Sequence, residues 1–173
     1  ARFPDLAHEI ENGGFRVEQL IGGDIWSVAL IWHPAPPAEE TRSLLAIRSE
    51  GKGNYLYLHQ DGAGIELRDN DGTASLRLPA TDPGWQAVVI ARAGARLGLW
   101  RPADDARAMG TIATGLSVPA DLLIGARSHR AGMAKTLGAG AIGGVLAWPG
   151  HDLLAPEPEP VAQDGEQRLA DPG

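Results

Sequence analysis

The chain has 173 residues, 43% of them hydrophobic, which suits one globular domain with a short extension. Its net charge of −7 excludes the basic surplus of a general nucleic-acid binder, and the absence of cysteine excludes disulfides, thiolate nucleophiles and cysteine-based zinc sites. No run of about 18 apolar residues occurs, so membrane insertion through a helix is not expected.

Short apolar segments separated by turn residues follow one another along the chain, and helical periodicity is nearly absent. In chain order, strands are predicted at Phe15–Ile21, Ile25–His33, Ser43–Ser49, Asn54–Gln60, Ile65–Asp69, Thr73–Leu78, Trp85–Arg92, Arg96–Arg101, Met109–Ala113, Asp121–Arg127 and Ala141–Trp148. Asp61-Gly62 and Ala93-Gly94 are turn signals between neighbouring strands. Many short strands at a spacing of about 8–12 residues are typical of a β-sandwich or barrel.

The composition changes near Ala155. The run Pro156-Glu157-Pro158-Glu159-Pro160 favours an extended, polyproline-like conformation, and the residues after it offer little to bury. We therefore predict one β-sandwich domain over residues 1–154 and an extended tail or linker over residues 155–173.

The order of several segments is similar to that of a known superfamily. These segments are WSVALIWHP (Trp26–Pro34), SLLAIRS (Ser43–Ser49), NYLYLHQDGAGIELR (Asn54–Arg68), GWQAVVIARAGARLGLW (Gly84–Trp100), LLIGAR (Leu122–Arg127) and AIGGVLAWPGHDL (Ala141–Leu153). Together they resemble the laminin G-like branch of the concanavalin A-like lectin/glucanase superfamily, over about Gly14 to Leu154. One departure is Arg101–Asp105, which stands where relatives usually place an Asp-Gly hairpin.

The resemblance implies an all-β, two-sheet antiparallel jelly-roll sandwich with one concave sheet. It also implies a non-catalytic recognition or adhesion module that binds a surface glycan or a protein partner. Such a module belongs to a larger multi-protein or oligomeric assembly, extracellular or virion-associated. Two alternatives stay open: a purely structural domain of a phage-like particle, and a polysaccharide-cleaving enzyme.

The acidic residues do not predict catalysis. Glucanase relatives carry closely alternating carboxylates on one strand face, whereas Glu9 and Glu11 precede the first convincing strand and Asp69 and Asp71 flank a turn. We predict no catalytic residues and no enzyme activity. The histidines show no metal-ligand spacing, so no metal or cofactor is expected, with Ca²⁺ on a loop rim as the alternative. Its candidate oxygen donors are Asp69, Asp71, Asp104, Asp105 and Asp121.

Alternation along the predicted strands leaves a group of aromatic and basic side chains on their outward faces. This group is Tyr55, Tyr57, His59, Arg68, Arg77, Arg96 and Trp100. If these faces belong to one sheet, they form a groove for a glycan or a protein partner, because aromatic rings stack on sugars and arginine binds hydroxyl or acidic groups. The alternative is plain packing beneath a long loop such as His129–Leu137.

The segment Ser128–Lys135 is basic within an acidic chain. Its residues His129, Arg130 and Lys135 are candidates to hold an anion or an acidic polysaccharide. The same pattern also fits a solvated hairpin tip.

Overall fold

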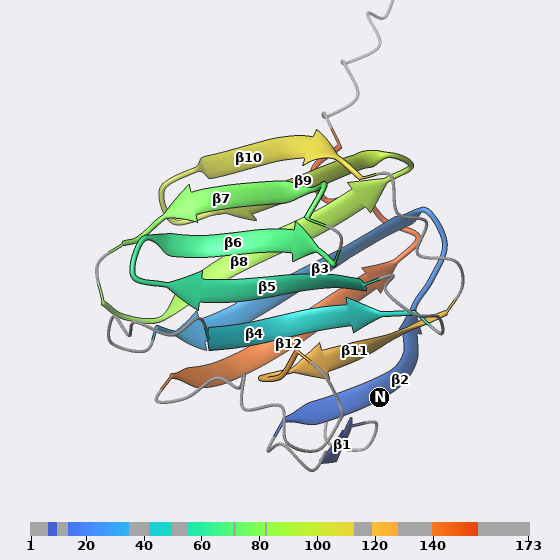
Figure 1. The fold of residues 1–173 in the computed structure, drawn as a ribbon, viewed down its shortest axis with the longest axis horizontal. Helices are drawn as coiled ribbons and strands as arrows, with labels where there is room; N and C mark the ends of the chain where they lie inside the picture. The colour runs from blue at the N-terminus through green and yellow to red at the C-terminus, as the bar shows by residue number, and fades with distance from the viewer. Residues whose placement is uncertain are drawn as a thin grey trace, which may run out of the picture.

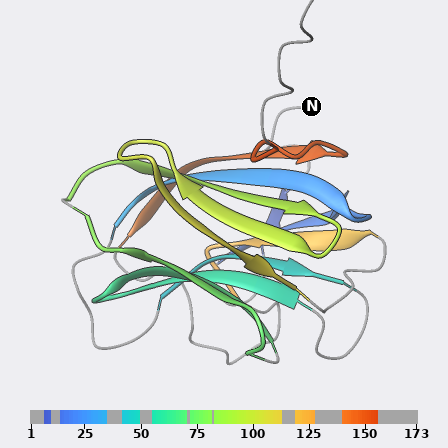
Figure 2. The same ribbon diagram turned by 90° about the horizontal axis from the view of Figure 1, so that it is seen from above.

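The computed structural model describes residues 7–9, 14–34, 42–49, 55–70, 72–81, 83–112, 119–127 and 140–155. These residues form two antiparallel β-sheets packed face to face, and Figure 2 shows the two layers edge on. The predicted all-β, two-sheet sandwich is therefore confirmed. Within the described ranges, no helix is long and apolar enough to cross a membrane.

The larger sheet contains β1 (Ala7–Glu9), β2 (Phe15–Ile21), β4 (Arg42–Arg48), β5 (Tyr55–Asp61), β6 (Gly64–Asp69), β7 (Ser75–Pro79) and β11 (Ala120–Ile124). The smaller sheet contains β3 (Ile25–His33), β8 (Gln86–Ala93), β9 (Arg96–Arg101), β10 (Ala106–Thr111) and β12 (Ala141–Pro149). The strand orders are β1-β2-β11-β4-β5-β6-β7 and β10-β9-β8-β3-β12, as Figure 1 shows. Neighbours such as β3 and β12 are far apart in the sequence, so most of the sandwich depends on long-range pairing.

Apolar and polar residues alternate along several of these strands, as expected where one face of a sheet is buried. In β7, Leu76 and Leu78 are buried while Ser75 and Arg77 are exposed. A strand places successive side chains on opposite faces, so an apolar residue at every second position buries one face only. Leu76 and Leu78 belong to the main core cluster, so the inward face of β7 packs into the sandwich.

Two tryptophans of β3 anchor the core. Trp26 and Trp32 lie six residues apart, which places both on the inner face, and they are 0% and 1% exposed. Buried tryptophan rings dominate core energetics, and truncation of such a ring to alanine costs about 3–5 kcal/mol. The two rings therefore hold the smaller sheet onto the larger one.

Tight hairpins join consecutive strands where the turn signals predict them. Asp61 pairs with Gly64 across β5 and β6, and Ala93 pairs with Arg96 across β8 and β9. Gly94 has φ 61°, a conformation that glycine adopts without strain. The predictions at Asp61-Gly62 and Ala93-Gly94 are confirmed.

The chain after β12 folds back over the smaller sheet. The amide of Gly150 donates to the carbonyl of Ile25 at 2.9 Å, and the amide of Leu153 donates to Ser27 Oγ at 2.9 Å. An ion pair joins Asp152 to Arg96. These contacts fasten the last described residues to the outer side of β3 and β9.

Some boundaries differ from the prediction. The three-residue strand β1 has too few residues to show a period, yet it pairs with β2 at the sheet edge. The strand predicted at Met109–Ala113 begins earlier, at Ala106. From Ala106 to Thr111, half-buried residues alternate with exposed ones, as in a strand with one covered face. In place of the Asp-Gly hairpin, residues 102–105 form the turn between β9 and β10. Of the predicted tail 155–173, only residue 155 is described.

Candidate functional site

The structure divides the predicted groove residues between two opposite faces. Tyr57, His59, Arg68 and Arg77 belong to β5, β6 and β7 of the larger sheet, whereas Arg96 and Trp100 belong to β9 of the smaller sheet. A single groove made from all of them is therefore wrong. Alternation predicts which side chains point outward, but sheet membership depends on long-range pairing that alternation does not encode. The side chain of Tyr55 and residues 129, 130 and 135 lie outside the described part of the chain.

On the larger sheet, the outward rings are covered. Tyr57 and His59 are 5% and 6% exposed, and Tyr57 forms a second small apolar cluster with Ala46 and Leu123. The guanidinium carbon of Arg127 lies 3.9 Å from the centre of the Tyr57 ring, a cation–π contact. Neither ring presents an open face on which a sugar can stack.

A charge network lies beside these rings. His59 Nε2 donates to Glu66 Oε2 at 2.9 Å, and Ser75 Oγ donates to Glu66 Oε1 at 2.5 Å. Arg77 Nη2 bridges two carboxylates, at 3.0 Å from Glu66 Oε2 and 2.8 Å from Asp61 Oδ2. A carboxylate as buried as Glu66, which is 8% exposed, is tolerated because each oxygen has a donor.

The network shifts several pKa values. The hydrogen bonds from Arg77 lower the pKa of Asp61 to about 2 and raise that of Arg77 above its ordinary value. Burial opposes ionisation of Glu66, but hydrogen bonds from Ser75, His59 and Arg77 outweigh it, so the pKa of Glu66 is lowered. Burial lowers the pKa of His59, and Glu66 offsets this only in part. At neutral pH the network thus holds two carboxylates, one guanidinium and a neutral imidazole.

The network has the composition of two kinds of site, a metal centre and a glycosidase carboxylate pair. His59, Asp61 and Glu66 offer ligand atoms within 4.8 Å of one another, a spacing that also brings the two carboxyl groups about as close as in retaining glycosidases. Arg77 lies between both carboxylates, however, and already supplies the positive charge that a metal ion brings. A glycosidase acid needs a raised pKa, and the pKa values of Asp61 and Glu66 are both lowered. The geometry supports neither role.

Four of the five candidate calcium donors are engaged by other groups, and residue 71 lies outside the described part of the chain. Asp69 accepts from the Thr73 amide at 2.8 Å, and Arg16 pairs with Asp121 at 2.6 Å. Asp104 and Asp105 accept from arginines of the β9–β10 hairpin. In the part of the chain that the structure describes, these carboxylates form no group of three converging oxygens.

On the smaller sheet, the Trp100 side chain contacts both Asp105 and Arg107. Its Nε1 donates to Asp105 Oδ1 at 2.9 Å, and the guanidinium of Arg107 lies 5.0 Å from the ring centre. Arg96 is paired with Asp152. The ring face that a sugar needs is therefore occupied by the protein's own cation.

Trp85 is an exposed aromatic side chain that the sequence analysis did not single out. It immediately precedes β8, and 60% of its surface is accessible. Its ring meets His33 edge on, with 5.6 Å between ring centres. It also lies over Gly143 of β12, where an added Cβ would come within 2.7 Å of Trp85 Cζ3. Both contacts fix the orientation of a ring that otherwise faces solvent.

An open groove of about 720 Å³ adjoins Trp85, within the range of small-molecule and oligosaccharide sites. Thr81, Gln86, Arg101 and Asp104 supply its polar walls. Arg101 is 2% exposed, and its Nε and Nη2 donate to the two oxygens of Asp104 at 2.9 and 2.7 Å. The groove floor is therefore a rigid, charge-neutral pair beside an aromatic ring.

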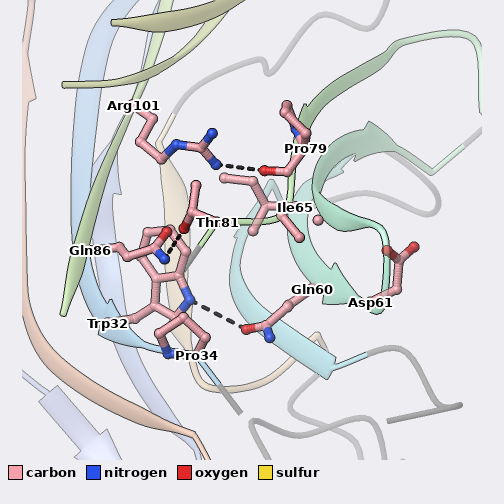
Figure 3. A pocket seen from close by; sticks show the side chains of 11 residues that line it. Trp32, Pro34, Gln60, Asp61, Ile65, Pro79, Thr81, Gln86 and Arg101 are labelled. Atoms are coloured by element: carbon pink, nitrogen blue, oxygen red, sulfur yellow. Dashed lines mark hydrogen bonds between the residues drawn. The ribbon is translucent and has the colours of Figure 1, made fainter. Parts of the chain in front are cut away.

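The groove continues into a small pocket between the two sheets (Figure 3). The two share Thr81, Gln86 and Arg101, and Arg101 Nη1 donates to the carbonyl of Pro79 at 2.7 Å. Trp32 Nε1 donates to Gln60 Oε1 at 3.3 Å across this pocket. Its volume of about 40 Å³ has room for water but not for a sugar ring, so of these two spaces only the outer groove has room for a larger molecule.

No protein-family model and no curated protein sequence matches the chain. Solved structures match it by fold. The mouse laminin α1 chain, domains LG4-5, is 14% identical with a TM-score of 0.55, over 82% of this chain and 41% of that one. A Trypanosoma rangeli sialidase in complex with 2,3-difluorosialic acid is 14% identical with a TM-score of 0.60, over 82% and 24%. The CBM40 of Ruminococcus gnavus IT-sialidase, bound to α2,3 sialyllactose, is 20% identical with a TM-score of 0.54, over 73% and 76%.

These likenesses define the fold. The chain has the concanavalin A-like, laminin G-like jelly-roll fold that the order of its segments predicts. It spans less than half the length of the laminin and sialidase chains that it matches.

Proposed function

We propose that this protein is a non-catalytic recognition module that binds a glycan in the groove beside Trp85. One observation carries the proposal: a tryptophan that is 60% exposed stands at the edge of an open groove with polar walls. Aromatic rings stack on the apolar faces of sugars, and nearby polar groups bind the hydroxyls that surround those faces. The CBM40 of Ruminococcus gnavus IT-sialidase, which this chain matches over similar shares of both chains, is bound to an oligosaccharide, and this supports a glycan as the ligand.

The charge of the groove favours an uncharged glycan. Arg101 is the only cation among its described lining residues, and Asp104 neutralises it in a bidentate pair. Hydrogen bonds from Arg101 hold the pKa of Asp104 below its usual range, so the carboxylate stays ionised at neutral pH. An acidic sugar therefore meets no unmatched positive charge here, whereas a sugar hydroxyl finds a carboxylate acceptor.

Binding to a panel of neutral and acidic polysaccharides, measured by affinity electrophoresis and calorimetry, tests the proposal. We expect neutral glycans to bind and Trp85→Ala to weaken binding about tenfold or more, because a lost stacking contact is worth about 0.5–1.5 kcal/mol beyond its area. Trp100→Ala is the matched control, because its ring is covered by Arg107, and it should bind as the wild type does. If no glycan binds, or if Trp85→Ala binds normally, the proposal is wrong. Release of reducing ends during binding would show that the module is not purely a binder.

The setting of such a module is part of the proposal. Recognition of a surface glycan within a larger extracellular assembly fits a domain that spans a minor part of the laminin chain it matches. Association with a phage-like particle remains a prediction from the sequence, and no feature of the described residues favours it over the extracellular setting.

A further inference from the structure

The small pocket between the two sheets is suited to a small side group of a larger ligand. Its volume is about 40 Å³, and one water molecule needs roughly 10–15 Å³ of such a space, so it has room for about three water-sized groups. Thr81, Gln86 and Arg101 line both the pocket and the open groove, so they form the boundary between the two spaces. A glycan in the groove can therefore place one side group of about three non-hydrogen atoms in the pocket.

The walls of this pocket are of two kinds. Trp32, Pro34 and Ile65 give it an apolar side, whereas Gln86 and Arg101 bring polar atoms to the same space (Figure 3). A side group that suits both kinds of wall carries a polar atom and a methyl group within a few bonds. A sugar hydroxyl or hydroxymethyl group has no methyl to cover the apolar wall, but an acetamido group has one.

Arg101 supplies a donor for a carbonyl oxygen in this pocket. A guanidinium has five N–H groups, and the bonds of Arg101 use Nε and Nη2 toward Asp104 and Nη1 toward the carbonyl of Pro79. Within the described part of the chain, one N–H on each of Nη1 and Nη2 has no further bond. The residue is 2% exposed, so these bonds hold a charged donor in place before a ligand enters.

A carboxylate is as small as an acetyl group, but the pocket does not suit it. Asp61 also lines the pocket, and it is ionised at neutral pH because hydrogen bonds from Arg77 lower its pKa to about 2. Arg101 is already matched by Asp104, so an acidic side group meets no unmatched cation among the described lining residues. An acetamido group carries no net charge and needs none.

We propose that the pocket between the sheets holds the acetamido group of an N-acetylhexosamine, so that the protein prefers neutral glycans built from N-acetylated sugars. The carbonyl oxygen of that group accepts from Arg101, and its methyl group packs against Ile65 and Trp32. The sugar rings stay in the outer groove, where Trp85 stands. The inference rests on the proposed glycan-binding function and names the class of sugar that the same site selects.

Calorimetry on the full chain with matched oligosaccharides tests this proposal. The pairs are N-acetylglucosamine against glucose and N-acetylgalactosamine against galactose, each pair with the same linkages, so that the members differ in one side group. At least one acetylated member should bind about tenfold or more tightly than its partner. Its N-propionyl form should bind about tenfold more weakly again, because one extra methylene exceeds the pocket. This ligand series uses the wild-type chain, so it does not depend on the folding of any variant.

A variant with a larger pocket checks that this pocket sets the preference. Ile65→Val removes one methylene from the pocket wall and should bring the N-propionyl glycan to within about threefold of the N-acetyl form. Ile90→Val is the matched control, because Ile90 is equally buried in the core but does not line the pocket, and it should leave the preference unchanged. Thermal melting checks that both variants are folded.

The outcomes separate this inference from the proposed function. Equal binding of the acetylated and hydroxyl members in both pairs, or an N-propionyl penalty that Ile65→Val leaves unchanged, overturns the inference while the glycan-binding function stands. Trp85→Ala should weaken both members of a pair in the same proportion, so it tests the stacking contact alone. If no glycan of any kind binds, the proposed function is wrong and this inference with it.

Discussion

Arg77 on β7 forms a bidentate ion pair with Asp61 at the end of β5, with Nη1–Oδ1 and Nη2–Oδ2 distances of 3.0 and 2.8 Å. The same Nη2 donates to Glu66 on β6, so one guanidinium ties three neighbouring strands together on the outer side of the larger sheet.

Removal of Arg77 should destabilise the domain. Arg77→Leu removes the nearer cation of the buried Glu66 and leaves only the 3.7 Å pair with Arg68, so we expect the free energy of unfolding to fall by about 1–3 kcal/mol in urea titration. The pair with Asp61 contributes little of this, because both partners are partly exposed to solvent. Arg107→Ala, which breaks an exposed pair, is the control and should change nothing measurable. A loss for Arg77→Leu below about 0.5 kcal/mol would show that Glu66 is solvated after all.

The lowered pKa of Asp61 predicts that the free energy of unfolding falls in acid. Its pKa of about 2 in the folded protein lies below the value of about 3.9 for an unfolded chain. A lowered carboxyl pKa means that the unfolded state binds the proton more tightly, so this stability is complete above about pH 4 and is lost as pH falls toward 2. Urea midpoints measured across this range should decline, and Asp61→Asn should flatten the decline by a modest amount, because the pair with Arg77 is partly exposed to solvent. If the urea midpoint of Asp61→Asn falls as steeply as that of the wild type, other carboxyl groups cause the loss of stability in acid.

His59 predicts a second, separate pH dependence. Burial lowers its pKa below 6.5, so the unfolded chain takes up a proton before the folded one does, and stability declines as pH falls below about 6.5. NMR titration should find the imidazole neutral at a pH where an exposed histidine is already half protonated. His59→Gln keeps a donor toward Glu66 and should remove this part of the pH dependence. A His59 pKa above 6.5 would mean that the ion pair with Glu66 outweighs burial.

Gly64 should resist substitution. Its φ is 143°, and an added Cβ would come within 2.1 Å of the Leu78 carbonyl oxygen, so the β6–β7 pairing must separate to admit a methyl group. We expect Gly64→Ala to cost about 2 kcal/mol or more, the upper range of backbone strain effects. Gly62→Ala, two residues earlier, meets nothing within 4 Å and should be close to neutral. Equal stability of the two variants would show that the backbone relaxes at Gly64.

The absence of a side chain at Gly143 should determine where the Trp85 ring lies. A Cβ in Gly143→Ala would come within 2.7 Å of Trp85 Cζ3, so the ring must leave its position between β12 and His33. Since Trp85 is largely exposed, we expect little change in stability but a shift in tryptophan fluorescence and about tenfold weaker glycan binding. Gly144→Ala, whose nearest contact is Ile31 Cδ1 at 3.9 Å, is the control. Unchanged binding in Gly143→Ala would mean that the ring need not be fixed.

The sequence predicts the strands well because their signal is local. Three predicted ranges, Phe15–Ile21, Ile25–His33 and Arg96–Arg101, coincide with β2, β3 and β9. Alternation within each strand is set by neighbouring residues, and glycine-containing turns mark the ends.

The site could be predicted only in part because its arrangement is not local. Whether Trp100 and Tyr57 share a face depends on which sheet β9 and β5 join, and that is decided by long-range pairing. Burial of Tyr57 depends on what packs over it from elsewhere in the chain. The outward position of Trp85, by contrast, could have been found: Val88 and Ile90 point inward, so an odd-numbered residue just before the strand points out.

The fastening of the chain end onto β3 has a mechanical consequence. Tension applied beyond Ala155 first loads the Asp152–Arg96 ion pair and the Leu153–Ser27 hydrogen bond, and only then reaches the edge strand β12. A pull on this end is therefore resisted first by contacts on the outer side of β3 and β9, before it reaches the strand pairing of the smaller sheet.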